Sequence, residues 1–160
     1  MRSLRFAIAA SAAMAASSFA IAQAQSRVTA AKPQTIVSAL ESAGYTAELG
    51  EDSEGDPKVR TALAGLNVNI LFYGCNDRGA NCRSLQLVVA FSRDEPIDLE
   101  RVNDWNARER WGTMSVDEEG DPNVTFDIAT EPNGIDYETF KSILSRWETV
   151  VANLKEHIWD

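Results

Sequence analysis

The densest group of side chains suited to molecular recognition lies between residues 103 and 112. This stretch combines two amides, two indoles and two guanidinium groups. Trp and Arg are the residue types that dominate the hot spots of protein interfaces. The stretch therefore predicts a noncovalent peptide-binding surface. The candidate binding residues are Asn103, Trp105, Asn106, Arg108, Arg110 and Trp111.

A structural role is the alternative for the same residues. Trp105 and Trp111 could pack in the core, because large aromatic side chains are usually mostly buried. Asn106 and Arg110 could then satisfy backbone groups where a helix turns into a strand. The two roles are compatible with each other.

Covalent catalysis finds little support in the sequence. His157 is the single histidine, so a Ser-His-Asp site would depend on a residue near the chain end, and the chain has no G-x-S-x-G motif. Neither a phosphate-cradling Gly-rich loop nor a dinucleotide fingerprint is present. We expect a protein that is not an enzyme and binds no metal or cofactor. A hydrolase of an envelope polymer that uses Asp or Glu residues stays an alternative, although no feature selects a carboxylate pair.

Two acidic turns, residues 52–57 and 117–122, share the sequence Glu-Gly-Asp-Pro. Each places three carboxylates at alternate positions, as a cation site would. Calcium, however, needs six to eight oxygen ligands and usually a bidentate Glu further along the chain, which neither turn supplies. The Gly and Pro residues favour rigid hairpin turns instead. The repeated motif also indicates that a helix-strand-strand unit could occur twice.

The two cysteines are expected to form a disulfide. Cys75 and Cys82 flank a turn-rich hexapeptide between two apolar runs, which places them at the neck of a hairpin loop. A redox dithiol is the alternative, but the spacing is not the C-x-x-C that lowers a thiol pKa. Paired cysteines are typical of an oxidising compartment.

The N-terminus has the features of a secretory signal peptide over residues 1–24. Arg2 and Arg5 precede a short Ala-rich apolar run, and small residues allow cleavage after Ala22 or Ala24. A membrane anchor would need about 20 strongly apolar residues. We therefore expect a periplasmic or secreted protein without an integral membrane segment after cleavage. Losing the two arginines shifts the formal net charge from -9 to -11, which argues against nucleic acid as a partner.

After an N-terminal lead over residues 25–32, residues 33–160 are expected to form one domain. Helices are predicted over residues 33–43, from the N-cap Asp98 onward with Leu99, Val102 and Trp105 inward, and over 136–157. Strands are predicted over 45–49, 59–63, 66–73, 83–91, 111–116 and 124–128. This order favours an α+β fold with about three helices packed on an antiparallel sheet.

The last predicted helix carries an apolar stripe with steps of three and four residues. Packing of this stripe on the chain's own sheet is the favoured use, and a homodimer seam is the alternative. The stripe consists of Phe140, Leu144, Trp147, Val151, Leu154 and Ile158.

Several motifs together resemble the YbjN-domain family over about residues 33–158. The motifs are Ala43-Gly44-Tyr45, Glu54-Gly55-Asp56-Pro57, Phe72-Tyr73-Gly74-Cys75, Asn81-Cys82, Asn103-Asp104-Trp105-Asn106 and Arg110-Trp111-Gly112. The resemblance implies a fold similar to type III secretion chaperones and a regulatory role in bacterial sensory transduction. The family has no established enzymatic activity or ligand, so the resemblance assigns neither to this chain.

The signal peptide and the cysteines depart from the better-known cytoplasmic members of the family, so their cytoplasmic role is not carried over. The leading hypothesis is a periplasmic, non-catalytic binding or chaperone-like regulatory domain that recognises a protein partner. A structural homodimer is a further alternative.

Overall fold

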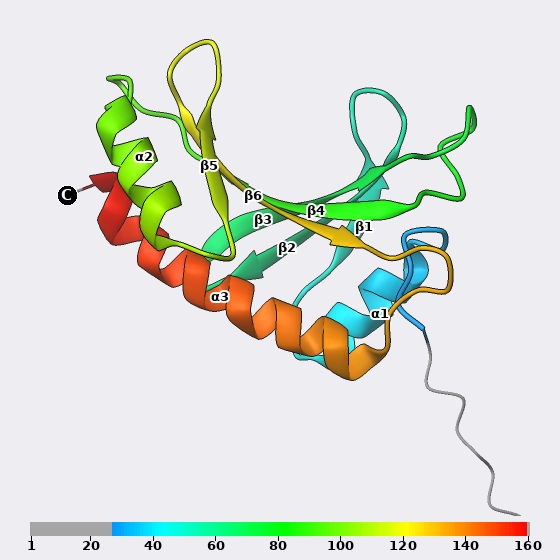
Figure 1. The fold of residues 1–160 in the computed structure, drawn as a ribbon. Helices are drawn as coiled ribbons and strands as arrows, with labels where there is room; N and C mark the ends of the chain where they lie inside the picture. Colours follow the sequence, from blue (N-terminus) through cyan, green and yellow to red (C-terminus); the bar gives the residue numbers. More distant parts are fainter. Residues whose placement is uncertain (1–26, 160) are drawn as a thin grey trace, which may run out of the picture.

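The computed structural model describes residues 27–159 as an α+β fold, in which three helices pack on a six-stranded antiparallel sheet (Figure 1). The predicted fold class is confirmed. The predicted signal peptide, residues 1–24, lies outside the described residues. The elements in chain order are α1 (Gln34–Ser42), β1 (Glu48–Glu51), β2 (Pro57–Leu63), β3 (Leu66–Tyr73), β4 (Ser84–Ala90), α2 (Leu99–Arg108), β5 (Thr113–Val116), β6 (Pro122–Ala129) and α3 (Tyr137–Trp159).

The strands are arranged in the order β1-β2-β3-β4-β6-β5, and all neighbours are antiparallel. Successive side chains of a strand point to opposite faces, so alternate residues are buried. On β3, for example, Val68, Ile70 and Phe72 are buried while Asn67 and Tyr73 are exposed. One face of the sheet therefore carries the core, and the other carries mainly polar side chains.

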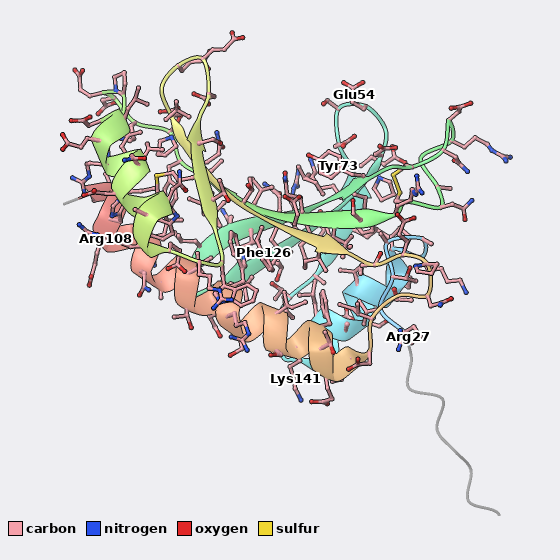
Figure 2. All side chains as sticks on the ribbon, in the orientation of Figure 1. Arg27, Glu54, Tyr73, Arg108, Phe126 and Lys141 are labelled. Carbon is pink, nitrogen blue, oxygen red and sulfur yellow. A yellow bond between two sulfur atoms is a disulfide. The ribbon has the colours of Figure 1, made fainter. Side chains whose placement is uncertain are left out.

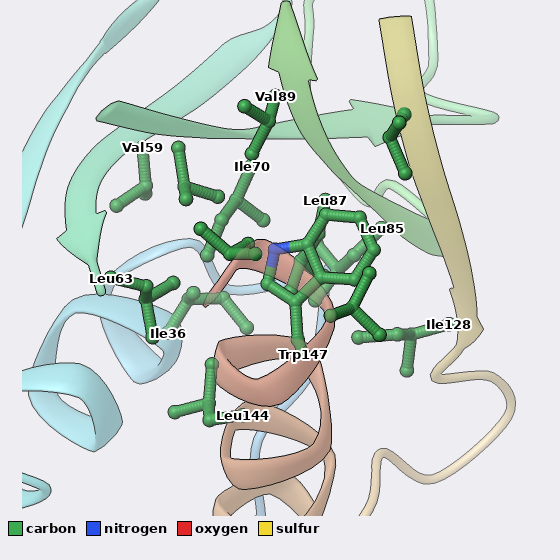
Figure 3. Packing of buried hydrophobic residues seen from close by; sticks show 14 of the residues in the cluster. Ile36, Val59, Leu63, Ile70, Leu85, Leu87, Val89, Ile128, Leu144 and Trp147 are labelled. Carbon is green, nitrogen blue, oxygen red and sulfur yellow. The ribbon is translucent and has the colours of Figure 1, made fainter. Parts of the chain in front are cut away.

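Helices α1 and α3 lie against the apolar face of the sheet (Figure 1). Trp147 of α3 is fully buried and lies close to Leu85 and Leu87 of β4 (Figure 3). All six residues of the predicted apolar stripe are buried in the same way, together with Val150. The stripe thus packs on the chain's own sheet, which is the use that its spacing favoured.

The two acidic turns have the same internal hydrogen bonds. Asp52 Oδ1 accepts from the backbone N–H groups two and four residues later, at 2.9 and 3.0 Å, and Asp117 Oδ1 does the same at 3.2 and 2.8 Å. Gly55 and Gly120 have φ angles of 88° and 83°, which favour glycine. These turns join β1 to β2 and β5 to β6, so the order helix-strand-strand with this turn occurs twice.

The predicted start of the first strand was wrong, because β1 begins at Glu48 rather than at Tyr45. Gly44 has a φ of 89°, and the Tyr45 N–H donates to Leu40 O at 3.0 Å. Tyr45 therefore still takes part in ending α1, through a left-handed C-terminal cap at Gly44. The remaining predicted elements are present with shifts of their ends by at most a few residues.

The prediction that Leu99 points inward was also wrong, because its side chain is 66 % exposed. A helix turns by about 100° per residue, so Leu99 lies about 120° around the helix from Trp105. Val102 lies only about 60° from Trp105 and is half-buried, packed against the core. The buried side of α2 is therefore too narrow to include Leu99.

Cys75 and Cys82 form a disulfide between the ends of β3 and β4, as expected. The segment before α1 is more ordered than a polar lead suggests. Val28 is 2 % exposed and forms an antiparallel bridge with Ile135, with N–H···O distances of 2.8 and 2.9 Å in the two directions. This contact ties the start of the described chain to the loop before α3.

Candidate functional site

The predicted binding residues lie on α2 and on the turn that leads into β5. Asp98 caps the helix, because its Oδ1 accepts from the Glu100 N–H at 2.9 Å. The helix ends at Arg108, and Glu109 has an extended backbone with φ -87° and ψ 132°. The chain then turns toward α3 before β5 begins at Thr113.

Trp105 is a structural anchor. Its side chain is 4 % exposed, and its Nε1–H donates to Gly112 O at 2.9 Å. Its ring lies 5.2 Å from the ring of His157 near the end of α3. Trp105 therefore connects α2, the β5 turn and α3, and its buried ring offers little surface to a partner.

Asn106 closes the outer edge of β5. Its Nδ2–H donates to Met114 O at 3.0 Å, and its Oδ1 accepts from the Met114 N–H at 2.8 Å. The amide thus takes the place of a neighbouring strand, which protects an edge that would otherwise have free backbone groups. Asn103 and Arg108 are exposed, and Arg108 pairs with Asp104 at 3.3 Å within the helix.

Trp111 is held in place by aromatic residues on the core side of its ring. Its ring packs edge-to-face on Phe126 of β6 at 5.6 Å, and Phe126 stacks on the buried Trp147 of α3 at 6.1 Å. Figure 2 shows Phe126 on the side of the sheet that faces α3, and Arg108 at the outer surface of α2. Trp111 itself is half-buried, so part of its ring remains at the surface.

Two arginines converge on the ring of Trp111. The guanidinium carbons of Arg110 and Arg146 lie 5.6 and 5.1 Å from the ring centroid, within the range of cation–π contacts. Both arginines are exposed. We refer to Arg110, Trp111 and Arg146 as the Arg–Trp–Arg cluster.

Neither arginine of the Arg–Trp–Arg cluster forms an ion pair within residues 27–159. The ion pairs in this part of the chain are Arg83–Glu131, Arg108–Asp104 and Lys141–Glu138. The nearby carboxylate of Glu109 instead accepts from the Arg110 and Trp111 N–H groups, at 2.9 and 3.3 Å. The cluster is therefore a local cationic site on an acidic chain.

The sequence placed Arg110 and Trp111 among the candidates but missed Arg146. This residue is 35 positions beyond Trp111, and its neighbour Trp147 was assigned to the apolar stripe that packs on the sheet. Its position one residue before Trp147 of the apolar stripe places it at the edge of the buried side of α3. Only the packing of α3 beside the β5 turn brings it to Trp111.

A groove of about 510 Å³ separates α2 from the end of α3. Inside it, the ring of His157 donates from Nε2 to Arg101 O at 2.8 Å, and the Arg101 guanidinium donates to His157 O. These reciprocal bonds satisfy a carbonyl at the end of α3 and hold the two helices together. The groove is lined by Arg101, Trp105, Arg108, Glu109, Asn153, Glu156 and His157.

Two further properties describe residues 27–159. No group of three or more His, Cys, Asp or Glu side chains in this range is arranged to hold a metal ion. The helices of the same range do not include one that is long and apolar enough to span a membrane.

Comparison with known proteins gives one family. No curated protein matches the sequence significantly. The family model of YbjN, described as "Putative bacterial sensory transduction regulator", matches residues 32–158 and so covers the whole sheet and nearly all of the three helices. The description names a regulator and not an enzyme. The chain belongs to the YbjN family.

Proposed function

We propose that this protein is an exported, non-catalytic regulator that binds a protein partner through the Arg–Trp–Arg cluster. The observation that carries the proposal is the convergence of two exposed guanidinium groups on one half-buried indole. Trp and Arg contribute most to protein interfaces when they lie next to each other in a desolvated centre. The family description as a regulator supports a binding role.

The proposed compartment is the periplasm or the outside of the cell. The disulfide between Cys75 and Cys82 supports an oxidising compartment. The signal-peptide pattern of residues 1–24 supports export by the secretory route. A partner would then be a protein of the cell envelope or its surroundings.

In-cell crosslinking of the tagged protein, followed by mass spectrometry, tests the proposal. The informative variant combines Arg110→Ala with Arg146→Ala, since both side chains are exposed and substitutions of exposed side chains usually change stability little. Arg78→Ala is the matched control, because Arg78 is an exposed arginine in the loop between Cys75 and Cys82, outside the candidate binding residues.

We expect one envelope protein to be recovered with the wild type and the control and to be lost with the double variant. Equal recovery with the double variant, with its fold verified by circular dichroism, would contradict the assigned surface.

A further inference from the structure

We infer that the Arg–Trp–Arg cluster binds an acidic segment of the partner, in which a carboxylate side chain stands beside an apolar one. This inference rests on the proposed function and names the chemistry that the cluster recognises. It follows from the charge, the rigidity and the surroundings of the cluster.

The charge of the cluster points to a carboxylate. The chain has a formal net charge of -9, yet Arg110 and Arg146 form no ion pair with another residue in the range 27–159. The residues three and four positions from Arg146 on α3 are Ser142, Ile143, Thr149 and Val150, so no helical neighbour carries a negative charge. A carboxylate from outside would thus meet two guanidinium groups without displacing an internal partner.

The stacking of the arginines prepares them for this ligand. A guanidinium group that lies over an aromatic face keeps its N–H edge free for bidentate bonds to a carboxylate. Trp111 is fixed in turn by Phe126, and Phe126 by the fully buried Trp147. Since the side chains are held before binding, less conformational entropy is lost when the ligand arrives.

The exposed part of the Trp111 indole favours an apolar side chain next to the carboxylate of the ligand. Trp111 is half-buried and lies between the two guanidinium groups and the core. An apolar side chain next to the carboxylate would cover this ring and exclude water from the charged bonds. A short acidic segment with one leucine or a similar residue matches both parts of the cluster.

A nucleic acid or an anionic lipid surface fits less well. Such ligands present many charges over a wide area, and the acidic chain repels them outside the cluster. Two arginines match one or two carboxylates. The test below therefore includes phosphate as a competing outcome.

The test is a titration of the isotope-labelled, disulfide-bonded protein, as exported, with a capped pentapeptide in which one leucine stands between two glutamates, followed by NMR. Two further peptides replace the glutamates by glutamines or lysines. We expect the shift changes to centre on the Trp111 indole and to saturate with the glutamate peptide. Binding of the other two peptides should be at least about tenfold weaker, since charge-assisted bonds are lost.

The protein variants keep the test specific. Arg110→Gln with Arg146→Gln should weaken binding of the glutamate peptide at least about tenfold. Arg78→Gln, in the loop between Cys75 and Cys82, should leave it unchanged, because Arg78 is exposed and lies outside the candidate site. Arg110→Lys with Arg146→Lys keeps the positive charges but loses the planar guanidinium groups that bind a carboxylate through two bonds, so we expect intermediate binding.

Besides a glutamate peptide that does not bind at all, three outcomes would overturn the inference. These are equal binding of the glutamine peptide, displacement of the glutamate peptide by equimolar inorganic phosphate, or unchanged binding by the double glutamine variant. If a partner is still crosslinked through the cluster while the glutamate peptide does not bind, the inference fails and the proposed function stands. If neither the crosslinked partner nor binding of the glutamate peptide is observed, the inference and the proposed function both fail.

Discussion

At the scale of single residues, Trp105 and Asn106 hold the start of β5 in place, whereas the side chains of Arg110 and Trp111 reach the surface. Asn106 and Trp105 were candidates for binding or for structure, and the geometry gives them structural bonds to Met114 and Gly112. Arg110 and Trp111 remain at the surface. The residue that completes their cluster, Arg146, could not be predicted, because its neighbour Trp111 is distant in sequence.

Asn106→Ala should lower the free energy of unfolding by about 1–2 kcal/mol, because two hydrogen bonds to the backbone of β5 are lost. Urea unfolding measures this change. Asn103→Ala is the matched control, since Asn103 is an exposed asparagine of the same helix, and it should have almost no effect. Equal effects of both substitutions would contradict the edge-closing role.

Asp136 should contribute to the pH dependence of stability. Hydrogen bonds from the backbone N–H and the hydroxyl of Thr139, both 2.8 Å, lower the pKa of this carboxyl below its ordinary value of 3.8. Because the pKa is lower in the folded state, the stabilisation is present above the ordinary value and is lost as the pH falls through the folded pKa.

The variant Asp136→Asn keeps an oxygen acceptor but does not titrate. Below about pH 4, the free energy of unfolding of this variant should therefore depend less on pH than that of the wild type. Denaturant unfolding from pH 2 to pH 7 tests this. An unchanged dependence of the free energy of unfolding on pH would contradict the effect of the Thr139 hydrogen bonds on Asp136.

At the scale of elements, periodicity and turn chemistry predicted most of the fold. The stripe of α3 and the alternation of the central strands were readable because burial follows helix and strand geometry. The start of β1 was not, since it depends on how α1 ends. The orientation of Leu99 was not, since the width of the buried side of α2 is set by tertiary packing. The contact between the β5 turn and α3 is also tertiary, and one glycine determines how close it is.

Gly112→Ala should lower the free energy of unfolding by about 1–3 kcal/mol. A Cβ atom at this position would lie 2.9 Å from Val150 Cγ1 and 3.0 Å from Val124 Cγ1, so the turn or the two valines would have to shift. Gly50→Ala in β1 is the control, because nothing lies within 4 Å of its Cβ. Thermal unfolding of both variants tests this prediction. Equal unfolding temperatures of the two variants would contradict the close contact of Gly112 with Val150 and Val124.

Replacing both cysteines, Cys75→Ser with Cys82→Ser, should lower the free energy of unfolding by up to about 2.5 kcal/mol, because the closed loop of eight residues restricts the unfolded chain. Reducing the wild type with dithiothreitol should produce a similar loss. A reduced wild type as stable as the oxidised one would show that the bridge does not support the fold.

At the scale of the whole molecule, the helices and the sheet divide the protein into two unlike sides. The two acidic turns rise on the side of the sheet that faces away from α3 (Figure 1). The Arg–Trp–Arg cluster joins the β5 turn to α3. The overall negative charge was evident from composition, whereas this local positive site needed the fold to become visible.

The central claim is that a protein partner contacts the molecule at the Arg–Trp–Arg cluster, and site-specific photo-crosslinking in cells tests it most directly. A photo-reactive amino acid would replace Thr149, one helical turn from Arg146, or Thr125 on the opposite face of the sheet. We predict a discrete crosslinked partner from position 149 that disappears when Arg110 and Arg146 are both alanine, and none from position 125. A partner captured from position 125 alone would contradict the account.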